Sequence, residues 1–171
     1  MPDTFIKIAS NTVGSGGASS VTFSSIPSTY TDLLLKISAR ASFSDYDLQL
    51  NVHLNGNTSN YSQRAVFGTG SNVYSYTATI AGYAASVMGA LGTANTFGNA
   101  EVYVPNYAGS TNKSYSVDNV TELNASTNNR LDLLAGLWSD TSAVSSMTIT
   151  TAGGTSFVQY STFTLYGISK S

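Results

Sequence analysis

The sequence predicts an all-β protein, an antiparallel two-sheet sandwich of jelly-roll-like type, and three observations support this class. Apolar and polar residues alternate through most of the chain, which is the pattern of strands with one buried face. Clusters of glycine and asparagine separate the alternating runs at short intervals. Helical periodicity is nearly absent. Many short strands divided by turns are typical of sandwiches and barrels, and 171 residues fit a single domain, residues 1–171.

Taken in order, the alternating runs predict strands near residues 5–9, 33–39, 48–54, 61–67, 74–80, 100–104, 115–123, 131–137, 147–149 and 163–165. The run from Leu48 to Leu54 is the clearest, because four apolar residues alternate with polar ones. Pro105 ends the strand before it or confines that strand to a sheet edge. Residues 81–99 are rich in small side chains, so they predict a long loop with at most one helical turn.

The apolar faces of these strands predict one shared core between the two sheets. If the alternation sets the inward face of each strand, one set of side chains should be buried together. We expect the core to contain Leu33, Leu35, Ile37, Leu48, Leu50, Val52, Leu54, Leu131, Leu133, Phe163 and Leu165.

The charge content is unusually low. Only 9% of the residues are charged, against about 25% in an ordinary soluble domain, and the net charge is −2. Without a basic patch, nucleic acid is not an expected partner, and the apolar runs are too short to cross a membrane. The N-terminus lacks the features of a signal peptide, so we expect synthesis in a cytoplasm without secretory export. A polar but nearly uncharged surface suits a chain covered by neighbours in an assembly.

Residues 1–20 combine a candidate strand, Phe5 to Ala9, with a glycine-rich hinge, Val13 to Gly17. Such a segment either pairs within its own sandwich or leaves it as an N-terminal arm, because an unpaired edge can add a strand to a neighbour. The sequence leaves both alternatives open. The arm predicts an oligomer in which the candidate partner-binding residues are Phe5, Ile6, Lys7 and Ile8.

The residues suggest no set for catalysis. His53, the single histidine, lies in mid-strand without a Gly-x-Ser-x-Gly turn, so we interpret it as an exposed strand residue. Asp45 and Asp47 are the one close pair of carboxylates, and they indicate a solvated turn more than a calcium site. A glycosidase pair would require scattered acids such as Glu101 and Asp132 to converge in the fold. We expect a non-enzyme with no catalytic residues, no cofactor and no metal.

The aromatic residues include eleven tyrosines and one tryptophan. Tyrosine side chains on a sheet can stack on sugars, but tyrosine is also simply a good strand residue. The candidates for an exposed aromatic group that binds a partner, such as a host-surface glycan, are Tyr74, Tyr76 and Tyr83.

Three segments resemble small β-sandwich virion proteins of tailed bacteriophages, of the capsid decoration or cement type. The segment Phe23 to Leu35, with its Pro-x-x-Tyr-x-Asp-Leu order, resembles the approach to a strand in these proteins. Leu54 to Ser62 is similar to the Asn-Gly turn that follows, and Thr162 to Ile168 is similar to the closing strand. Where the family usually has an acid after Asn-Gly, this chain has Asn57, which argues against a metal at that turn.

The resemblance implies a structural protein of the virion, made in the host cytoplasm. We expect a capsid decoration protein that binds the major capsid protein lattice and its own copies, and the family's threefold positions imply a homotrimer. The alternative is a tail-fibre module that binds a receptor or glycan. The number of copies per particle would discriminate between them, because decoration requires hundreds and a tail requires few.

Overall fold

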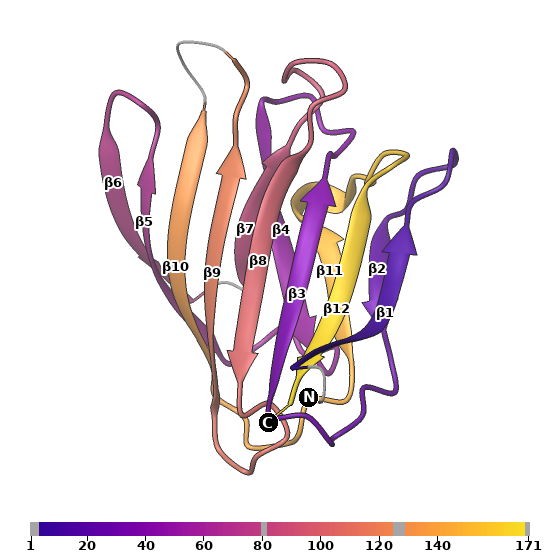
Figure 1. The fold of residues 1–171 in the computed structure, drawn as a ribbon. Helices are drawn as coiled ribbons and strands as arrows, with labels where there is room; N and C mark the ends of the chain where they lie inside the picture. The colour runs from indigo at the N-terminus through magenta and orange to yellow at the C-terminus, as the bar shows by residue number, and fades with distance from the viewer. Residues whose placement is uncertain (1–3, 80–81, 125–128, 170–171) are drawn as a thin grey trace.

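The computed structural model describes residues 4–79, 82–124 and 129–169. They form a sandwich of two antiparallel sheets, as the sequence predicts (Figure 1). The single helical element among these residues is a short 3-10 turn, η1 (Ala152–Gly154). The strands are β1 (Phe5–Thr12), β2 (Ser20–Phe23), β3 (Asp32–Ala39), β4 (Asp47–Leu54), β5 (Tyr61–Gly68), β6 (Val73–Ala78), β7 (Tyr83–Met88), β8 (Gly98–Pro105), β9 (Lys113–Thr121), β10 (Arg130–Trp138), β11 (Met147–Thr151) and β12 (Thr162–Ile168).

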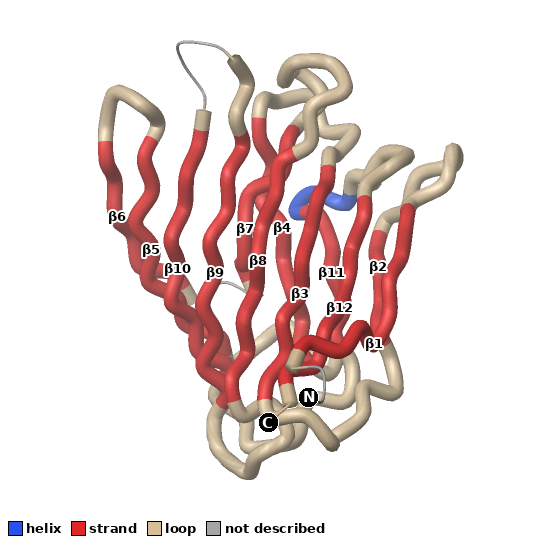
Figure 2. The backbone as a smooth tube through the Cα atoms, in the orientation of Figure 1, coloured by secondary structure: helices blue, strands red, loops and turns tan. Residues whose placement is uncertain are grey.

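The two sheets differ in size. The large sheet has the order β1-β12-β3-β8-β9-β10-β5-β6, and the small sheet has the order β2-β11-β4-β7. The edge strand β7 packs against β8, β9 and β10. Figure 2 shows that β5 and β6 continue the large sheet beyond the small one. The inner face of this end of the large sheet is therefore only partly covered.

The core lies between the sheets and contains most of the predicted residues. Those confirmed as buried are Leu33, Leu35, Ile37, Leu48, Leu50, Val52, Leu54, Phe163 and Leu165. They come from β3, β4 and β12, the strands whose alternation is clearest. Trp138 and Phe157 are also completely buried.

The prediction was wrong for Leu131 and Leu133, which are 59% and 61% exposed. In β10 the alternate residues face inward, among them Leu134 and Trp138. A shift of one residue exchanges the two faces of a strand, and β10 carries leucines on both.

Each of the three segments that carry the family resemblance contains a residue with a clear role in the fold. Asn55 and Gly56 have φ values of 52° and 70°, so the turn after β4 needs residues that tolerate left-handed backbone. The Asn55 side chain also accepts a hydrogen bond from the backbone N–H of Ser145 at 2.8 Å. Gly167 lies under the ring of Tyr30, where a Cβ atom would approach that ring to 2.3 Å.

Part of the segment predicted as a loop is a strand, β7. Every residue of β7 is buried, so the strand shows no polar–apolar alternation and is not visible to a search for period two. Beyond it, the guanidinium of Arg40 donates to four backbone carbonyl groups. Its Nη1 lies 2.6 Å from Thr93 O and 3.0 Å from Thr96 O, and its Nη2 reaches the carbonyl oxygens of Ala90 and Gly92.

Candidate functional site

Of the two conformations that the sequence left open, the N-terminal segment has the one in which it pairs within its own sandwich. β1 pairs along its length with β12 of the same chain, and a register shift between Lys7 and Ala9 marks a β-bulge. The glycine-rich segment is a tight turn, because Val13 is buried and the Gly17 N–H donates to Gly14 O at 3.0 Å. β1 is thus an edge strand of its own sandwich.

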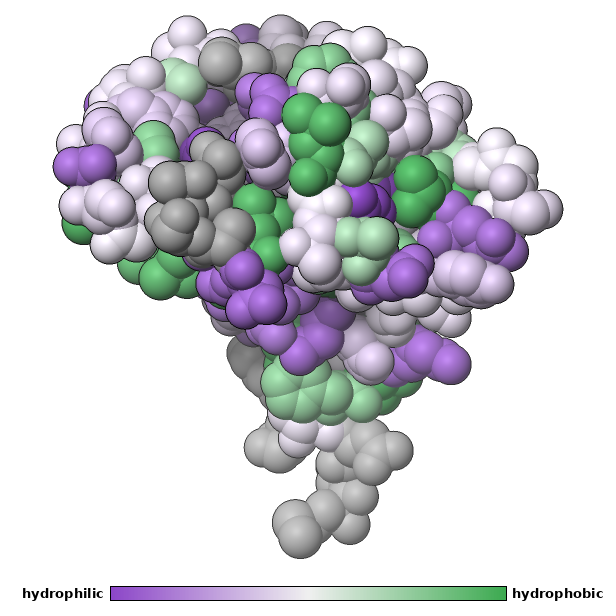
Figure 3. All heavy atoms as spheres, turned by 90° about the horizontal axis from the view of Figure 1, so that it is seen from above, coloured by the Kyte–Doolittle hydropathy of each residue, from purple (hydrophilic) through white to green (hydrophobic). Residues whose placement is uncertain are grey.

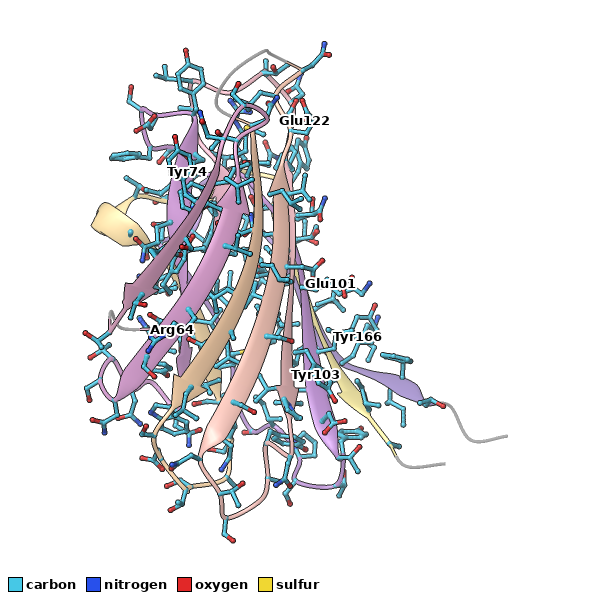
Figure 4. All side chains as sticks on the ribbon, turned by 90° about the vertical axis from the view of Figure 1, so that its left-hand side faces the viewer. Arg64, Tyr74, Glu101, Tyr103, Glu122 and Tyr166 are labelled. Carbon is cyan, nitrogen blue, oxygen red and sulfur yellow. The ribbon has the colours of Figure 1, made fainter. Side chains whose placement is uncertain are left out.

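The predicted partner-binding residues of β1 lie at this edge. Phe5 is 57% exposed and Ile6 is 37% exposed, whereas Lys7 is exposed and Ile8 is half-buried. Phe5 and Tyr166 line a shallow hollow on the outer face of the large sheet. Figure 4 shows Glu101, Tyr103 and Tyr166 on the same side of this sheet.

At the other end of the large sheet, the outer face is apolar. Leu133 of β10 lies opposite Val66 of β5. Two residues earlier on β10, Leu131 lies opposite Gly68 of β5, and Gly68 in turn pairs with Val73 of β6. Val66 is 41% exposed and Val73 is 76% exposed. We call this group, Val66, Val73, Leu131 and Leu133, the outer patch.

The outer patch borders a groove. The groove has a volume of about 740 Å³, and its walls include Arg64, Ser75, Thr77, Ser116 and Leu133. The next residues along the same face are charged, because Asp118 lies opposite Leu133 and Glu101 lies opposite Asp118. Glu101 in turn pairs with Lys36 at 2.6 Å. The outer face is therefore apolar at one end and polar in the middle.

The edge strand next to the outer patch lacks the usual protection. β6 contains no charged residue and no proline between Val73 and Ala78. Natural proteins usually block such an edge with a charge, a proline or a bulge, because free N–H and C=O groups template further pairing. β1, in contrast, has both a lysine and a bulge.

Tyr74 and Tyr76 lie on the inner face of this end of the large sheet, and Tyr83 lies on β7 of the small sheet. The three candidate tyrosines differ in exposure. Tyr74 is 48% exposed, Tyr76 is half-buried and Tyr83 is only 4% exposed, so the expectation of an exposed group was wrong for Tyr83. Phe67 joins them into a row. Ring centroids are 5.9 Å apart for Tyr83 and Tyr76, 6.0 Å for Tyr76 and Phe67, and 5.0 Å for Phe67 and Tyr74. Figure 4 shows Tyr74 high on β6.

A half-buried arginine, Arg130, lies against this aromatic row. The Nε of Arg130 donates to both carboxylate oxygens of Asp132 at 2.9 Å, and its Nη2 donates to the same residue at 2.8 Å. Nη2 also donates to the Tyr83 hydroxyl at 3.1 Å. The guanidinium carbon lies 4.1 Å from the centre of the Phe67 ring, within range of a cation–π contact. Asp47 of β4 completes the cluster, 3.6 Å from Nη1.

Burial changes the ionisation of these groups. Burial raises the pKa of Asp47 above its usual value, although the charge of Arg130 opposes this shift. Burial alone would lower the pKa of Arg130, but the hydrogen bonds and the charge of Asp132 outweigh it, so the pKa lies above the ordinary value. Arg130 therefore stays charged, with two carboxylates beside it.

Asp132, one of the scattered acids, lies beside Arg130 together with Asp47 of the predicted close pair, yet the geometry does not favour acid–base chemistry. Both oxygens of Asp132 accept hydrogen bonds from Arg130, and the Asp132 side chain is 2% exposed, so this carboxylate has no free face for a substrate.

His53 is half-buried on β4, opposite Thr148, and is less exposed than predicted. In residues 4–79, 82–124 and 129–169, no three His, Cys, Asp or Glu side chains cluster as metal ligands would.

Sequence reasoning named the tyrosines and Asp132 but did not connect them with Arg130 and Phe67. The available signal was the Arg-x-Asp spacing at the start of the strand predicted near residues 131–137, because both charges share one face if the strand begins at Arg130. In a chain with 9% charged residues, two opposite charges on one strand face deserve weight.

No family model, curated protein or solved structure matches this chain. Among the residues that the structure describes, none of the helical segments has the length and apolar character needed to cross a membrane.

Proposed function

We propose that this chain is a structural protein of a tailed-bacteriophage particle, of the capsid decoration type. In this role it binds the major capsid protein lattice and its own copies, in a trimer. The observation that carries the proposal is the outer patch. Contiguous exposed apolar side chains on a soluble protein usually mark an interaction site, because their contact with water is unfavourable. Leu131 and Leu133, both more than half exposed, are the centre of that patch.

A repeated protein surface is the partner that best fits this patch. The patch is formed by few side chains, whereas a stable isolated interface uses about 20–30 residues on each side. A single contact through the patch is therefore weak. On a lattice, contacts to the shell and to sister chains act together, and the effective affinity rises without any new contact.

The rest of the surface is consistent with close packing of copies. In the view along the strands in Figure 3, much of the surface consists of residues of intermediate hydropathy, with strongly hydrophilic residues scattered among them. With a net charge of −2, self-repulsion between neighbouring copies is small.

The patch substitution Leu133→Asp tests this role. Shells that lack the chain are mixed with the purified protein, and bound protein is measured by sedimentation. We expect Leu133→Asp to weaken loading at least about tenfold, which corresponds to about 1.4 kcal/mol. Leu91→Asp is the matched control, because Leu91 is 54% exposed but lies in the loop after β7. Equal loading of wild type and Leu133→Asp would contradict the role of the patch.

The copy number decides between the shell and the tail. Electron cryomicroscopy of the particle should find the chain in hundreds of copies on the capsid. A few copies at the tail would support the alternative, a tail-fibre module that binds a glycan, for which the aromatic row at Tyr74 is the favouring observation.

A further inference from the structure

A pocket lies between the two sheets, on the face of β10 opposite the outer patch. Its volume is about 250 Å³, and its lining includes Asp47, Gln49, Tyr76, Tyr83, Ser86 and Arg130. These residues come from β4, β6, β7 and β10, so the pocket exists only where both sheets meet. Drug-sized ligands occupy pockets of about 300–1,000 Å³, so this pocket suits a smaller ligand.

The guanidinium of Arg130 is held rigidly in the pocket wall. Asp132 and Tyr83 together hold Nε and Nη2 of Arg130, so the guanidinium cannot rotate without breaking several hydrogen bonds. Its remaining nitrogen, Nη1, is 3.6 Å from Asp47 Oδ2, which is longer than a hydrogen bond. Nη1 is a donor and Asp47 is an acceptor. A hydroxyl group, which both accepts and donates, matches this pair.

The charges of the pocket select the ligand class. One arginine stands beside two carboxylates, Asp47 and Asp132, so the local charge is negative and disfavours an anion. A cation placed against Asp47 would also lie close to the guanidinium of Arg130, which is 3.6 Å from that carboxylate and would repel the cation. A neutral ligand with several hydroxyl groups avoids both penalties.

The aromatic row supplies the apolar contact. Tyr76 and Tyr83 line the pocket, and the row continues through Phe67 to the exposed ring of Tyr74. Aromatic rings provide a flat apolar surface beside a polar group, which suits a ligand with one apolar face and one hydroxylated edge. A sugar ring in the chair form has this division.

We propose that this pocket binds one neutral hexose unit of a glycan. The hexose packs its C–H face on Tyr76, and adjacent hydroxyl groups bind Asp47 and Nη1 of Arg130. The exposed end of the aromatic row, at Tyr74, receives the next unit of the chain. This inference goes beyond the assembly role, because the pocket and the outer patch use opposite faces of β10.

Saturation-transfer NMR with the full chain tests the proposal. The probes are glucose, galactose and mannose as methyl glycosides, with N-acetylneuraminate as the anionic control and glucosamine as the cationic one. We expect binding of at least one neutral hexose with a Kd on the order of 1 mM, the range for a ligand of this size. Failure of all neutral hexoses to bind, or a preference for either charged sugar, overturns the proposal.

Matched variants locate the binding. Asp47→Asn removes the charged acceptor and should weaken hexose binding at least about tenfold. Asp45→Asn makes the same charge change at an exposed neighbour and should bind as wild type does. Tyr76→Leu should abolish binding, and Tyr160→Leu, at a ring that is 68% exposed elsewhere, should not. Thermal unfolding checks the fold of each variant. Unchanged hexose binding by folded Asp47→Asn would place any sugar site elsewhere and overturn the assignment.

Discussion

Replacing Arg130 with methionine tests whether the buried ion pair supports the inner face of β10. The variant leaves Asp132, whose side chain is 2% exposed, without its cation. Removing one partner of a buried pair costs about 3–5 kcal/mol, because the remaining charge is buried without compensation. The Arg130 side chain is 22% exposed, so water reaches its outer side, and we expect a cost near the lower limit, about 3 kcal/mol. For a chain of this length that corresponds to a melting temperature lower by about 6–12 °C.

The double variant Arg130→Met/Asp132→Leu separates the pair from its surroundings. Apolar residues of similar volume often replace a buried pair without loss, so the double variant should recover most of the stability that Arg130→Met loses. Urea denaturation of the wild type, both single variants and the double variant measures the coupling free energy. A loss below about 1 kcal/mol in Arg130→Met, or a double variant as unstable as the single one, would refute this reasoning.

Two further predictions concern Tyr115. Gly136→Ala should lower the free energy of unfolding by about 1–3 kcal/mol, because its methyl group would lie 2.0 Å from Tyr115 Cζ. The control is Gly14→Ala, whose methyl group enters open space, so this variant should be neutral in the same thermal melt. Burial raises the pKa of Tyr115 to about 12 from 10.0, so its contribution to stability is complete below pH 10 and is lost as the pH rises from about 10 to 12. Urea unfolding between about pH 9 and 11 should show this loss as a fall in the free energy of unfolding of up to about 1.4 kcal/mol per pH unit. In Tyr115→Phe the free energy of unfolding should fall less steeply with pH. Equal slopes in the wild type and the variant would contradict the assignment.

The sequence predicted the strands whose two faces differ in chemistry. In β4, leucine and valine alternate with asparagine, glutamine and histidine, and one register alone buries the apolar face. In β10 the alternation fails as a guide. Leu131 and Leu133 occupy one face, and Leu134 and Trp138 the other, so composition alone does not decide which is buried. The partner strand decides it, because Tyr115 of β9 leaves room only for Gly136.

The candidate pocket was less accessible to prediction, because its members are distant in the sequence. Tyr74 and Tyr76 were visible as an aromatic face, but Phe67 joins them only through the pairing of β5 with β6. Asp47 and Arg130 come from different sheets, and no spacing rule connects them. β7, which brings Tyr83 to this position, is buried on both faces and lacks the alternation that identifies a strand.

The bonds of Arg40 have a consequence for how this chain tolerates change. In the turn that follows β7, one guanidinium binds the backbone carbonyl groups of Ala90, Gly92, Thr93 and Thr96. Each of these bonds ends on a backbone oxygen, so none of them depends on which side chain the turn carries at that position. They depend instead on a single side chain, fifty residues earlier than the first of those carbonyls. Lysine at that position would retain the charge but not the planar array of donors that reaches all four oxygens.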